Sequence, residues 1–268
     1  MSNDERFAEI NGARLHYKID GAVGLPWVVL INSLATDLTM WEPQIAALTR
    51  TCRVLRSDAR GHGKSRATPA PYTIDLLVDD TFGLMNHVGA SRACVVGLSL
   101  GGLTAIAAGL RRDPRVAGIA VCDSRADMPP EFVTGIESRN RLAREQGMTP
   151  IAEQMVGRWF TRPTLDSDAG VVSMVRQMIL TTTVEGFVGC AEAVKCSGLM
   201  ERLEELTCPS LFLVGDADAA VPVEVQRAMQ TRVAGSRFAV IAGAGHLSNI
   251  EQPDSFNAAL LSFLRATP

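Results

Sequence analysis

The sequence predicts an α/β fold: a mostly parallel sheet with helices on both faces and a helical segment inserted into the chain. Short apolar runs, typical of strands buried on both faces, occur at residues 27–31, 93–96, 116–122 and 210–214. Segments with apolar residues at helical spacing separate several of these runs, and strands that alternate with helices favour a parallel sheet. Between residues 123 and 207 the alternation stops and only helical stretches occur.

Length and composition fit one large α/β domain. The 268 residues are 47% hydrophobic, so the chain can bury a large core. A net charge of −3 favours neither nucleic acid nor an anionic membrane as partner, and no apolar run is long enough to span a bilayer. The four histidines lack metal-ligand spacing and no Cys-x-x-Cys occurs, so we expect no metal. Six scattered cysteines and the absence of a signal-peptide pattern predict reduced thiols in a cytoplasmic protein.

The individual elements follow from local patterns. Asn11-Gly12 joins two alternating runs at residues 7–10 and 14–19, which is a strong β-hairpin signal. The other predicted strands cover residues 27–31, 52–56, 93–96, 116–122, 210–214 and 237–241. The predicted helices outside the insertion cover residues 41–48, 72–88, 103–110, 223–234 and 253–265.

The insertion is predicted to be mostly helical, with no strand. Its helical stretches cover residues 131–146, 151–160, 171–184 and 186–194. An all-helical insertion in a parallel-sheet protein is most simply a lid over the site at the sheet edge. We therefore divide the chain into a core, residues 1–122 and 208–268, and a helical lid, residues 123–207.

The strongest chemical signal is Cys-Val-Val-Gly-Leu-Ser-Leu-Gly-Gly at residues 94–102. It contains Gly-x-Ser-x-Gly between a predicted strand and a predicted helix, which is the context that this pattern requires. Gly97 and Gly101 leave room for the neighbouring strand and helix, while the tight turn lifts the Ser99 hydroxyl out of the fold. The pentapeptide can also occur by chance in a glycine-rich chain. If the pattern is meaningful, Ser99 is a nucleophile that attacks a carbonyl, and a base and an acid must accompany it.

Candidates for the base and the acid follow two later strands, at the sheet edge where Ser99 is expected. His246 lies in a glycine-flanked loop after the last strand and is the predicted base. Asp216 and Asp218 compete for the acid; Asp218 is favoured because Asp216, nearer the strand end, is expected to tie down the loop. The order Ser, Asp, His is that of the α/β-hydrolase fold.

The predicted oxyanion hole consists of two backbone N–H groups. One belongs to Leu100, directly after the nucleophile, and the other to Leu34, in the loop after the strand at residues 27–31. The expected chemistry is acyl transfer through Ser99 with no cofactor. Haloalkane dehalogenases and epoxide hydrolases of this fold need a carboxylate nucleophile, so a serine excludes both.

These residues resemble the α/β-hydrolase superfamily, and within it most closely the 3-oxoadipate enol-lactonases. Residues 31–41, Ile-Asn-Ser-Leu-Ala-Thr-Asp-Leu-Thr-Met-Trp, are similar to the lactonase segment Asn-Ser-Leu-Gly-Thr-Asp-Leu-x-Met-Trp, where most hydrolases of this fold have His-Gly. Residues 58–65 match the widespread loop Asp-x-Arg-Gly-His-Gly-x-Ser, and residues 97–103, 158–161, 186–190 and 246–251 resemble lactonase segments. The resemblance implies the triad Ser99, Asp218 and His246. It also implies a small-molecule substrate, a cyclic enol ester bearing a carboxylate, in aromatic catabolism.

The insertion departs from the lactonase pattern. Residues 123–126 are Asp-Ser-Arg-Ala where lactonases have Asn-Thr-Ala-Ala, and Phe132 and Gly135 stand near a lactonase Trp and Arg. A carboxylate in an apolar pocket needs a cation or several donors. We predict that Arg125 or Arg158 faces the pocket, with Phe132 and Trp159 beside the substrate. Most of the other insertion arginines are expected to be solvated; they are Arg139, Arg141, Arg144 and Arg162.

Several functions remain compatible with the same residues. They are hydrolysis of a different lactone or ester, a general carboxylesterase, a carbon–carbon bond hydrolase, a cofactor-free perhydrolase and a ligand-binding receptor. The sequence decides neither the substrate nor the oligomeric state.

Overall fold

In a computed structural model, which describes residues 5–267, the chain forms an eight-stranded sheet with the order β1-β2-β4-β3-β5-β6-β7-β8. β1 pairs antiparallel with β2 and β2 antiparallel with β4, whereas all later pairs are parallel. The strands are β1 (Arg6–Ile10), β2 (Ala13–Asp20), β3 (Trp27–Ile31), β4 (Arg53–Ser57), β5 (Ala93–Leu98), β6 (Val116–Cys122), β7 (Ser210–Gly215) and β8 (Arg237–Ile241). The predicted fold class is confirmed.

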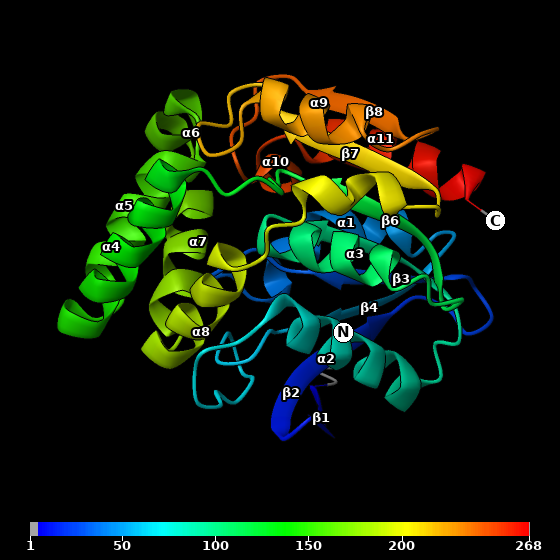
Figure 1. The fold of residues 1–268 in the computed structure, drawn as a ribbon, viewed down its shortest axis with the longest axis horizontal. Helices are drawn as coiled ribbons and strands as arrows, with labels where there is room; N and C mark the ends of the chain where they lie inside the picture. The colour runs from blue at the N-terminus through cyan, green and yellow to red at the C-terminus, as the bar shows by residue number, and fades with distance from the viewer. Residues whose placement is uncertain (1–4, 268) are drawn as a thin grey trace.

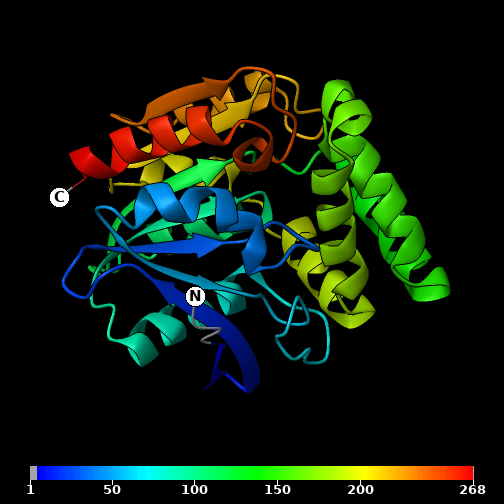
Figure 2. The same cartoon turned by 180° about the vertical axis from the view of Figure 1, so that it is seen from behind.

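Helices cover both faces of the sheet (Figures 1 and 2). α2 (Ile74–Val88), α3 (Leu100–Leu110) and α9 (Val223–Thr231) share one apolar cluster, while α1 (Glu42–Leu48) and α11 (Pro253–Ala266) belong to the other. Alternate residues of β5 enter the two clusters, Val95 the first and Val96 the second. A strand buried on both faces explains the continuous apolar runs of the sequence.

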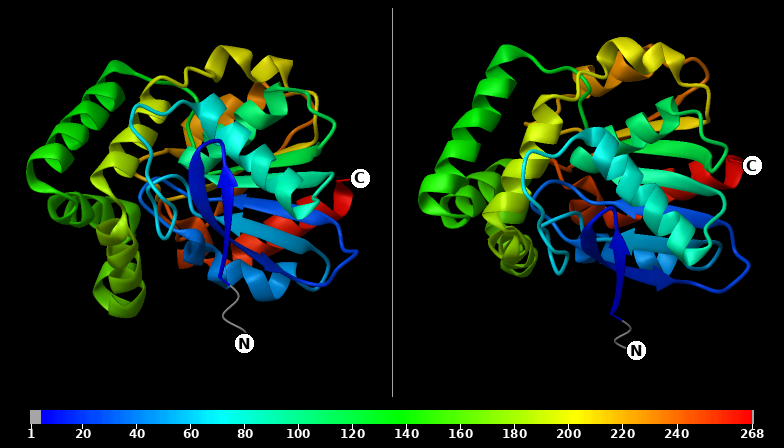
Figure 3. Two further views of the ribbon diagram at one scale, coloured as in Figure 1. Left: turned by 90° about the horizontal axis from the view of Figure 1, so that it is seen from below. Right: turned by 60° about the horizontal axis from the view of Figure 1, so that its bottom comes forward.

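Most of the segment between β6 and β7 lies beside the sheet rather than on one of its faces (Figures 1 and 3), whereas its last helix packs against α3. Its helices are α4 (Pro130–Gln146), α5 (Thr149–Trp159), α6 (Arg162–Ser167), α7 (Ala169–Thr181), α8 (Val184–Lys195) and the 3-10 helix η2 (Met200–Glu205). Within residues 5–267, no helix is both long and apolar enough to cross a membrane.

Differences from the predicted elements have local causes. α6 was not predicted because it buries no residue, so it has no apolar periodicity. α7 ends at Thr181 rather than at residue 184, since Thr183 instead caps α8 by accepting a hydrogen bond from the Gly186 N–H. Two short helices, η1 (Leu38–Trp41) and α10 (Ser248–Glu251), lie where loops were expected.

The topology creates a crevice at one edge of the sheet. β3 lies between β4 and β5, so the chain leaves β3 towards one side and later returns to its other side. The loops that leave two adjacent parallel strands in opposite directions separate at the carboxyl ends of these strands. Open α/β sheets bind ligands in the crevice between such loops. The loops after β3 and β5 carry Leu34 and Ser99.

Candidate active site

Ser99 forms a sharp turn between β5 and α3. Its φ of 57° and ψ of −111° are unusual for a residue with a side chain. The turn depends on glycine, because a Cβ on Gly97 would lie 1.9 Å from the Gly101 carbonyl oxygen, and one on Gly101 2.2 Å from the Ile31 oxygen. Only glycine at both positions lets β5, α3 and β3 approach this closely. The turn leaves the Ser99 side chain half-buried, and this side chain lines a cavity.

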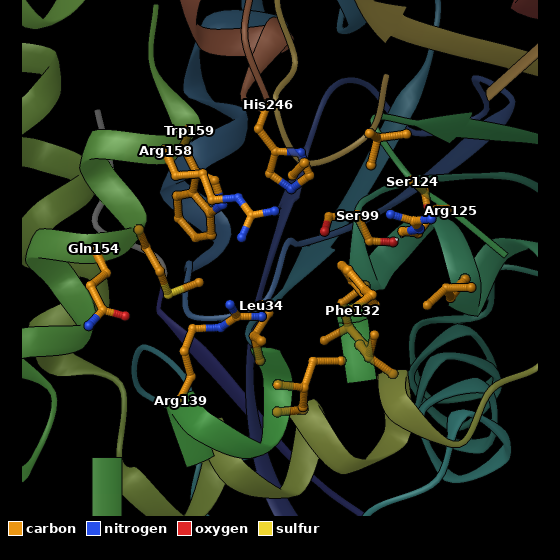
Figure 4. A pocket seen from close by; sticks show the side chains of 18 residues that line it. Leu34, Ser99, Ser124, Arg125, Phe132, Arg139, Gln154, Arg158, Trp159 and His246 are labelled. Atoms are coloured by element: carbon orange, nitrogen blue, oxygen red, sulfur yellow. Dashed lines mark hydrogen bonds between the residues drawn. The ribbon is translucent and has the colours of Figure 1, made fainter. Parts of the chain in front are cut away.

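Ser99 and His246 line the same cavity, which has a volume of about 160 Å³ (Figure 4). The close view shows the His246 ring turned towards Ser99. The wall is mostly apolar; its hydrophobic side chains include Leu34, Leu103, Phe132, Ile136, Met155, Trp159, Val194 and Val221. The insertion thus supplies one wall of the cavity, and the strand ends of the core supply the other.

His246 and Asp218 are both buried and lie in contact, with 2.8 Å between His246 Nδ1 and Asp218 Oδ2. The other carboxylate oxygen, Oδ1, accepts hydrogen bonds from the Ala220 and Val221 N–H groups at 2.7 and 3.0 Å. Burial alone would lower the pKa of His246, but the charge and hydrogen bond of Asp218 outweigh it, and the pKa is raised. With Nδ1 held by Asp218, Nε2 is the ring nitrogen left to accept a proton.

The insertion also holds His246 in position. The His246 N–H donates to the Trp159 carbonyl oxygen at 2.8 Å, and the two ring centroids lie 5.8 Å apart. Glu251 accepts hydrogen bonds from the N–H groups of Gly245 and Thr161 and so ties the histidine loop to the end of α5. Trp159 therefore contacts the candidate base as well as lining the cavity.

Asp216 lies apart from this arrangement. It is exposed, and its Oδ1 accepts a hydrogen bond from the Gly243 N–H at 2.8 Å. The contact joins the loop after β7 to the loop after β8, which is the tying role expected for Asp216. Of the two competing aspartates, Asp218 is the one that contacts His246.

Two backbone N–H groups are available next to Ser99. Within residues 5–267, neither the Leu34 nor the Leu100 N–H has an acceptor in the protein. Asn32 fixes the first loop, since its Nδ2 donates to the Ser57 carbonyl at 2.8 Å and its Oδ1 accepts from the Trp41 indole at 3.0 Å. Leu100 is the first residue of α3, where backbone N–H groups have no partner within the helix.

The cavity contains three arginines with different partners. Arg125 is paired with Asp127 through two contacts of 3.0 and 2.7 Å, and its guanidinium lies 4.7 Å from the Phe132 ring centroid. In the part of the chain that the structure describes, Arg139 and Arg158 have neither an ion pair nor a hydrogen bond. Figure 4 shows both of their side chains reaching into the cavity.

Arg139 corrects the sequence analysis, which expected most insertion arginines outside this site to be solvated. Arg139 is half-buried and lines the cavity; burial lowers its pKa, and the charge of Arg158 lowers it further. The sequence contained a signal for this position of Arg139, because residues 132, 136 and 139 follow helical spacing and place Arg139 on the apolar face of α4. Gln154, also on this wall, was missed because it had no pattern to single it out.

The chain matches the model of the alpha/beta hydrolase family over residues 28–259. The chain belongs to the α/β hydrolase family.

Among its relatives, 3-oxoadipate enol-lactonase 2 of Acinetobacter baylyi is 31% identical over 94% of this chain and 93% of that protein. The enol-lactonase of Burkholderia xenovorans superposes with a TM-score of 0.93 at 38% identity, covering 97% of this α/β hydrolase and all of that chain. A thermophilic esterase of Thermogutta terrifontis, solved with malate bound, has a TM-score of 0.91 at 33% identity, covering 98% and 99%. The predicted likeness to the enol-lactonases is confirmed.

Proposed function

We propose that this α/β hydrolase cleaves a small carboxylic ester or lactone through Ser99, His246 and Asp218. The observation that carries the proposal is the strained Ser99 turn opening on the same cavity as a buried His246 that contacts Asp218 at 2.8 Å. A nucleophile, a base and a group that orients the base are the three parts of serine acyl transfer.

In the proposed reaction, His246 Nε2 takes the Ser99 hydroxyl proton as the oxygen attacks the ester carbonyl. The Leu34 and Leu100 N–H groups donate to the oxyanion. When the carbonyl re-forms, the C–O bond to the leaving enol breaks, and His246 returns the proton to that oxygen. In a lactone, the enol stays attached through the acyl chain on Ser99. A water molecule, deprotonated by His246, then releases the acid and restores Ser99. No step needs a cofactor.

The substrate class we propose is an enol-lactone that bears a carboxylate, such as 3-oxoadipate enol-lactone. Arg139 and Arg158 support an anionic ligand, because both line one partly enclosed, mostly apolar cavity and neither has a counter-ion among residues 5–267; Arg139 is half-buried and Arg158 is exposed. The names of two relatives, an enol-lactonase and an esterase solved with malate bound, support the same class. The insertion, residues 123–207, would act as the lid that closes over this substrate.

Removing either free arginine should weaken binding of the anionic substrate selectively. We expect Arg139→Ala and Arg158→Ala each to raise KM for a carboxylated lactone by about tenfold, which corresponds to roughly 1.4 kcal/mol. A neutral ester such as p-nitrophenyl acetate should be hydrolysed almost as by the wild type. Steady-state kinetics on both substrates measures the difference.

Arg162→Ala is the matched control, since Arg162 is an exposed arginine of the same insertion, paired with Asp166 on its own helix. It should change neither KM. Equal loss on both substrates, or a wild-type preference for neutral esters, would contradict the carboxylated-lactone class and leave the hydrolase mechanism standing.

The pH dependence of hydrolysis should report His246. The base must be neutral to accept a proton, so activity falls as pH decreases through its pKa. Burial opposes the imidazolium, but Asp218 outweighs burial and raises this pKa above its ordinary value of 6.5. As the pH is lowered, kcat/KM for p-nitrophenyl acetate should therefore fall to half of its maximum at a pH above 6.5. A half-point on the acid side of that value would mean that Asp218 does not stabilise the charged ring.

The open alternatives are separated by one panel of substrates offered to the wild type and to Ser99→Ala. Lactones and short esters test the proposal, a carbon–carbon bond substrate tests that alternative, and peracid formation from acetate and peroxide tests the perhydrolase. Ligand binding without turnover of any substrate would favour the receptor. We expect the highest kcat/KM on a carboxylated lactone.

A further inference from the structure

One carboxylate joins the insertion to the loop that carries His246. It belongs to Glu251, the half-buried last residue of α10. Its Oε1 accepts hydrogen bonds from the N–H and the hydroxyl of Thr161, at 2.9 and 2.8 Å. Its Oε2 accepts from the Gly245 N–H at 2.5 Å. Donors from two segments far apart in the sequence therefore converge on one side chain.

The same two segments also meet through their backbones. The His246 N–H donates to the Trp159 carbonyl oxygen at 2.8 Å. A Cβ on Gly245 would lie 2.5 Å from that oxygen and 3.0 Å from Glu251 Oε2, so this close approach needs glycine. Together these contacts fix the backbone of His246 against the end of α5.

The ring and the backbone of His246 are held by different parts of the molecule. Asp218, in the loop after β7, contacts the ring at Nδ1, whereas the insertion contacts the backbone N–H. A shift of the backbone would therefore move Nε2 relative to Ser99 even if the Asp218 contact is kept. Misplacement of a reacting group by about 1 Å can cost about 10²-fold in rate.

We propose that Glu251 is a positioning residue, which holds His246 in place for proton transfer by docking residues 159–161 against the histidine loop. The inference rests on the proposed function, because it concerns the same base. Glu251 does not line the cavity, so it acts through His246 rather than on the substrate. The insertion then has a second task besides forming one wall of the cavity, since its α5 end supports the base.

Glu251→Gln tests the carboxylate. Glutamine has the same length, but its NH₂ group must face either the Gly245 N–H or the Thr161 N–H, so one side of the contact is lost in either orientation. We expect kcat on p-nitrophenyl acetate to fall about 10²-fold, with KM close to that of the wild type because the cavity lining is unchanged. An unchanged kcat, or a raised KM with kcat retained, overturns the proposal.

Glu185→Gln is the matched control. Glu185, in the first turn of α8, also joins the insertion to the core, because its Oε1 accepts from the Ala70 N–H at 2.6 Å. It does not line the cavity, and its contact is to the loop after β4 rather than to the histidine loop. Glu185→Gln should keep the wild-type kcat and KM. An equal loss of kcat in this variant would overturn a specific role of Glu251.

Gly245→Ala separates position from charge. The added Cβ forces the histidine loop away from the Trp159 carbonyl, while the Glu251 carboxylate remains. The fall in kcat with little change in KM should therefore recur. Wild-type kcat in Gly245→Ala would mean that the position of the loop does not limit catalysis, and would overturn the proposal.

Hydrogen exchange measured by mass spectrometry reports the contact without turnover. In Glu251→Gln, peptides that contain Thr161 or residues 245–246 should exchange about tenfold faster than in the wild type, while peptides of β5 and β6 keep their rates. Unchanged exchange at these N–H groups overturns the inference even if kcat falls. Hydrolysis that persists in Ser99→Ala would instead overturn the proposed function, and the exchange rates would still decide whether Glu251 holds the histidine loop.

Discussion

Replacing Ser99 with Ala should lower kcat for ester and lactone hydrolysis by about 10⁴–10⁶-fold, the scale of losing a triad nucleophile. The hydroxyl is the only group at this turn that can form the acyl bond. Its loss leaves no cavity in the core, because the side chain faces the pocket. Steady-state kinetics on a chromogenic ester measures the loss, and an unchanged thermal midpoint shows that the fold is retained.

Ser91→Ala is the matched control, since Ser91 is an exposed serine just before the opposite end of β5. Its activity should equal that of the wild type. Turnover by Ser99→Ala within about tenfold of the wild type would end the assignment of Ser99, because residual catalysis without a nucleophile is far smaller.

Asp218→Asn should lower kcat by about 10⁴-fold. The carboxylate accepts the proton on His246 Nδ1 at 2.8 Å, which keeps Nε2 free to accept from Ser99. An amide at the same place can donate to Nδ1 and so favours the tautomer with its proton on Nε2, where it blocks catalysis. The fold should survive, because the amide oxygen can still accept from the Ala220 and Val221 N–H groups.

Asp216→Asn should retain most of the activity and act mainly on stability, since Asp216 contacts Gly243 rather than His246. Reversed effects of the two substitutions would move the catalytic acid two residues earlier in the chain. Parallel measurement of kcat and thermal midpoint on both variants separates the two roles.

The parts of the site that short-range sterics determine could be predicted from the sequence. The turn around Ser99 needs glycine at two fixed positions, and the strand and helix beside it are visible as an apolar run and an Ala- and Leu-rich segment. His246 and Asp218 follow strands whose carboxyl ends must meet at one edge of a parallel sheet. The same reasoning placed Leu34 in the loop after β3.

Features that depend on how distant segments pack were not accessible in this way. Arg125 is neutralised by Asp127, whereas Arg139 lines the cavity, and side-chain partners of this kind follow from the three-dimensional packing of α4 and α5. The environment of Asp123 needs β6, β7 and the helix after His246 to come together. In the sequence, Asp123 stands out only as a departure from the lactonase pattern.

Detection of the acyl-enzyme tests most directly whether Ser99 attacks the carbonyl. The wild type is mixed with p-nitrophenyl acetate, quenched in acid during turnover, and analysed by intact mass and peptide mapping. The mechanism predicts a mass increase of one acetyl group, located on Ser99 and absent from Ser99→Ala. Turnover without an adduct, or an adduct that Ser99→Ala retains, would contradict the mechanism.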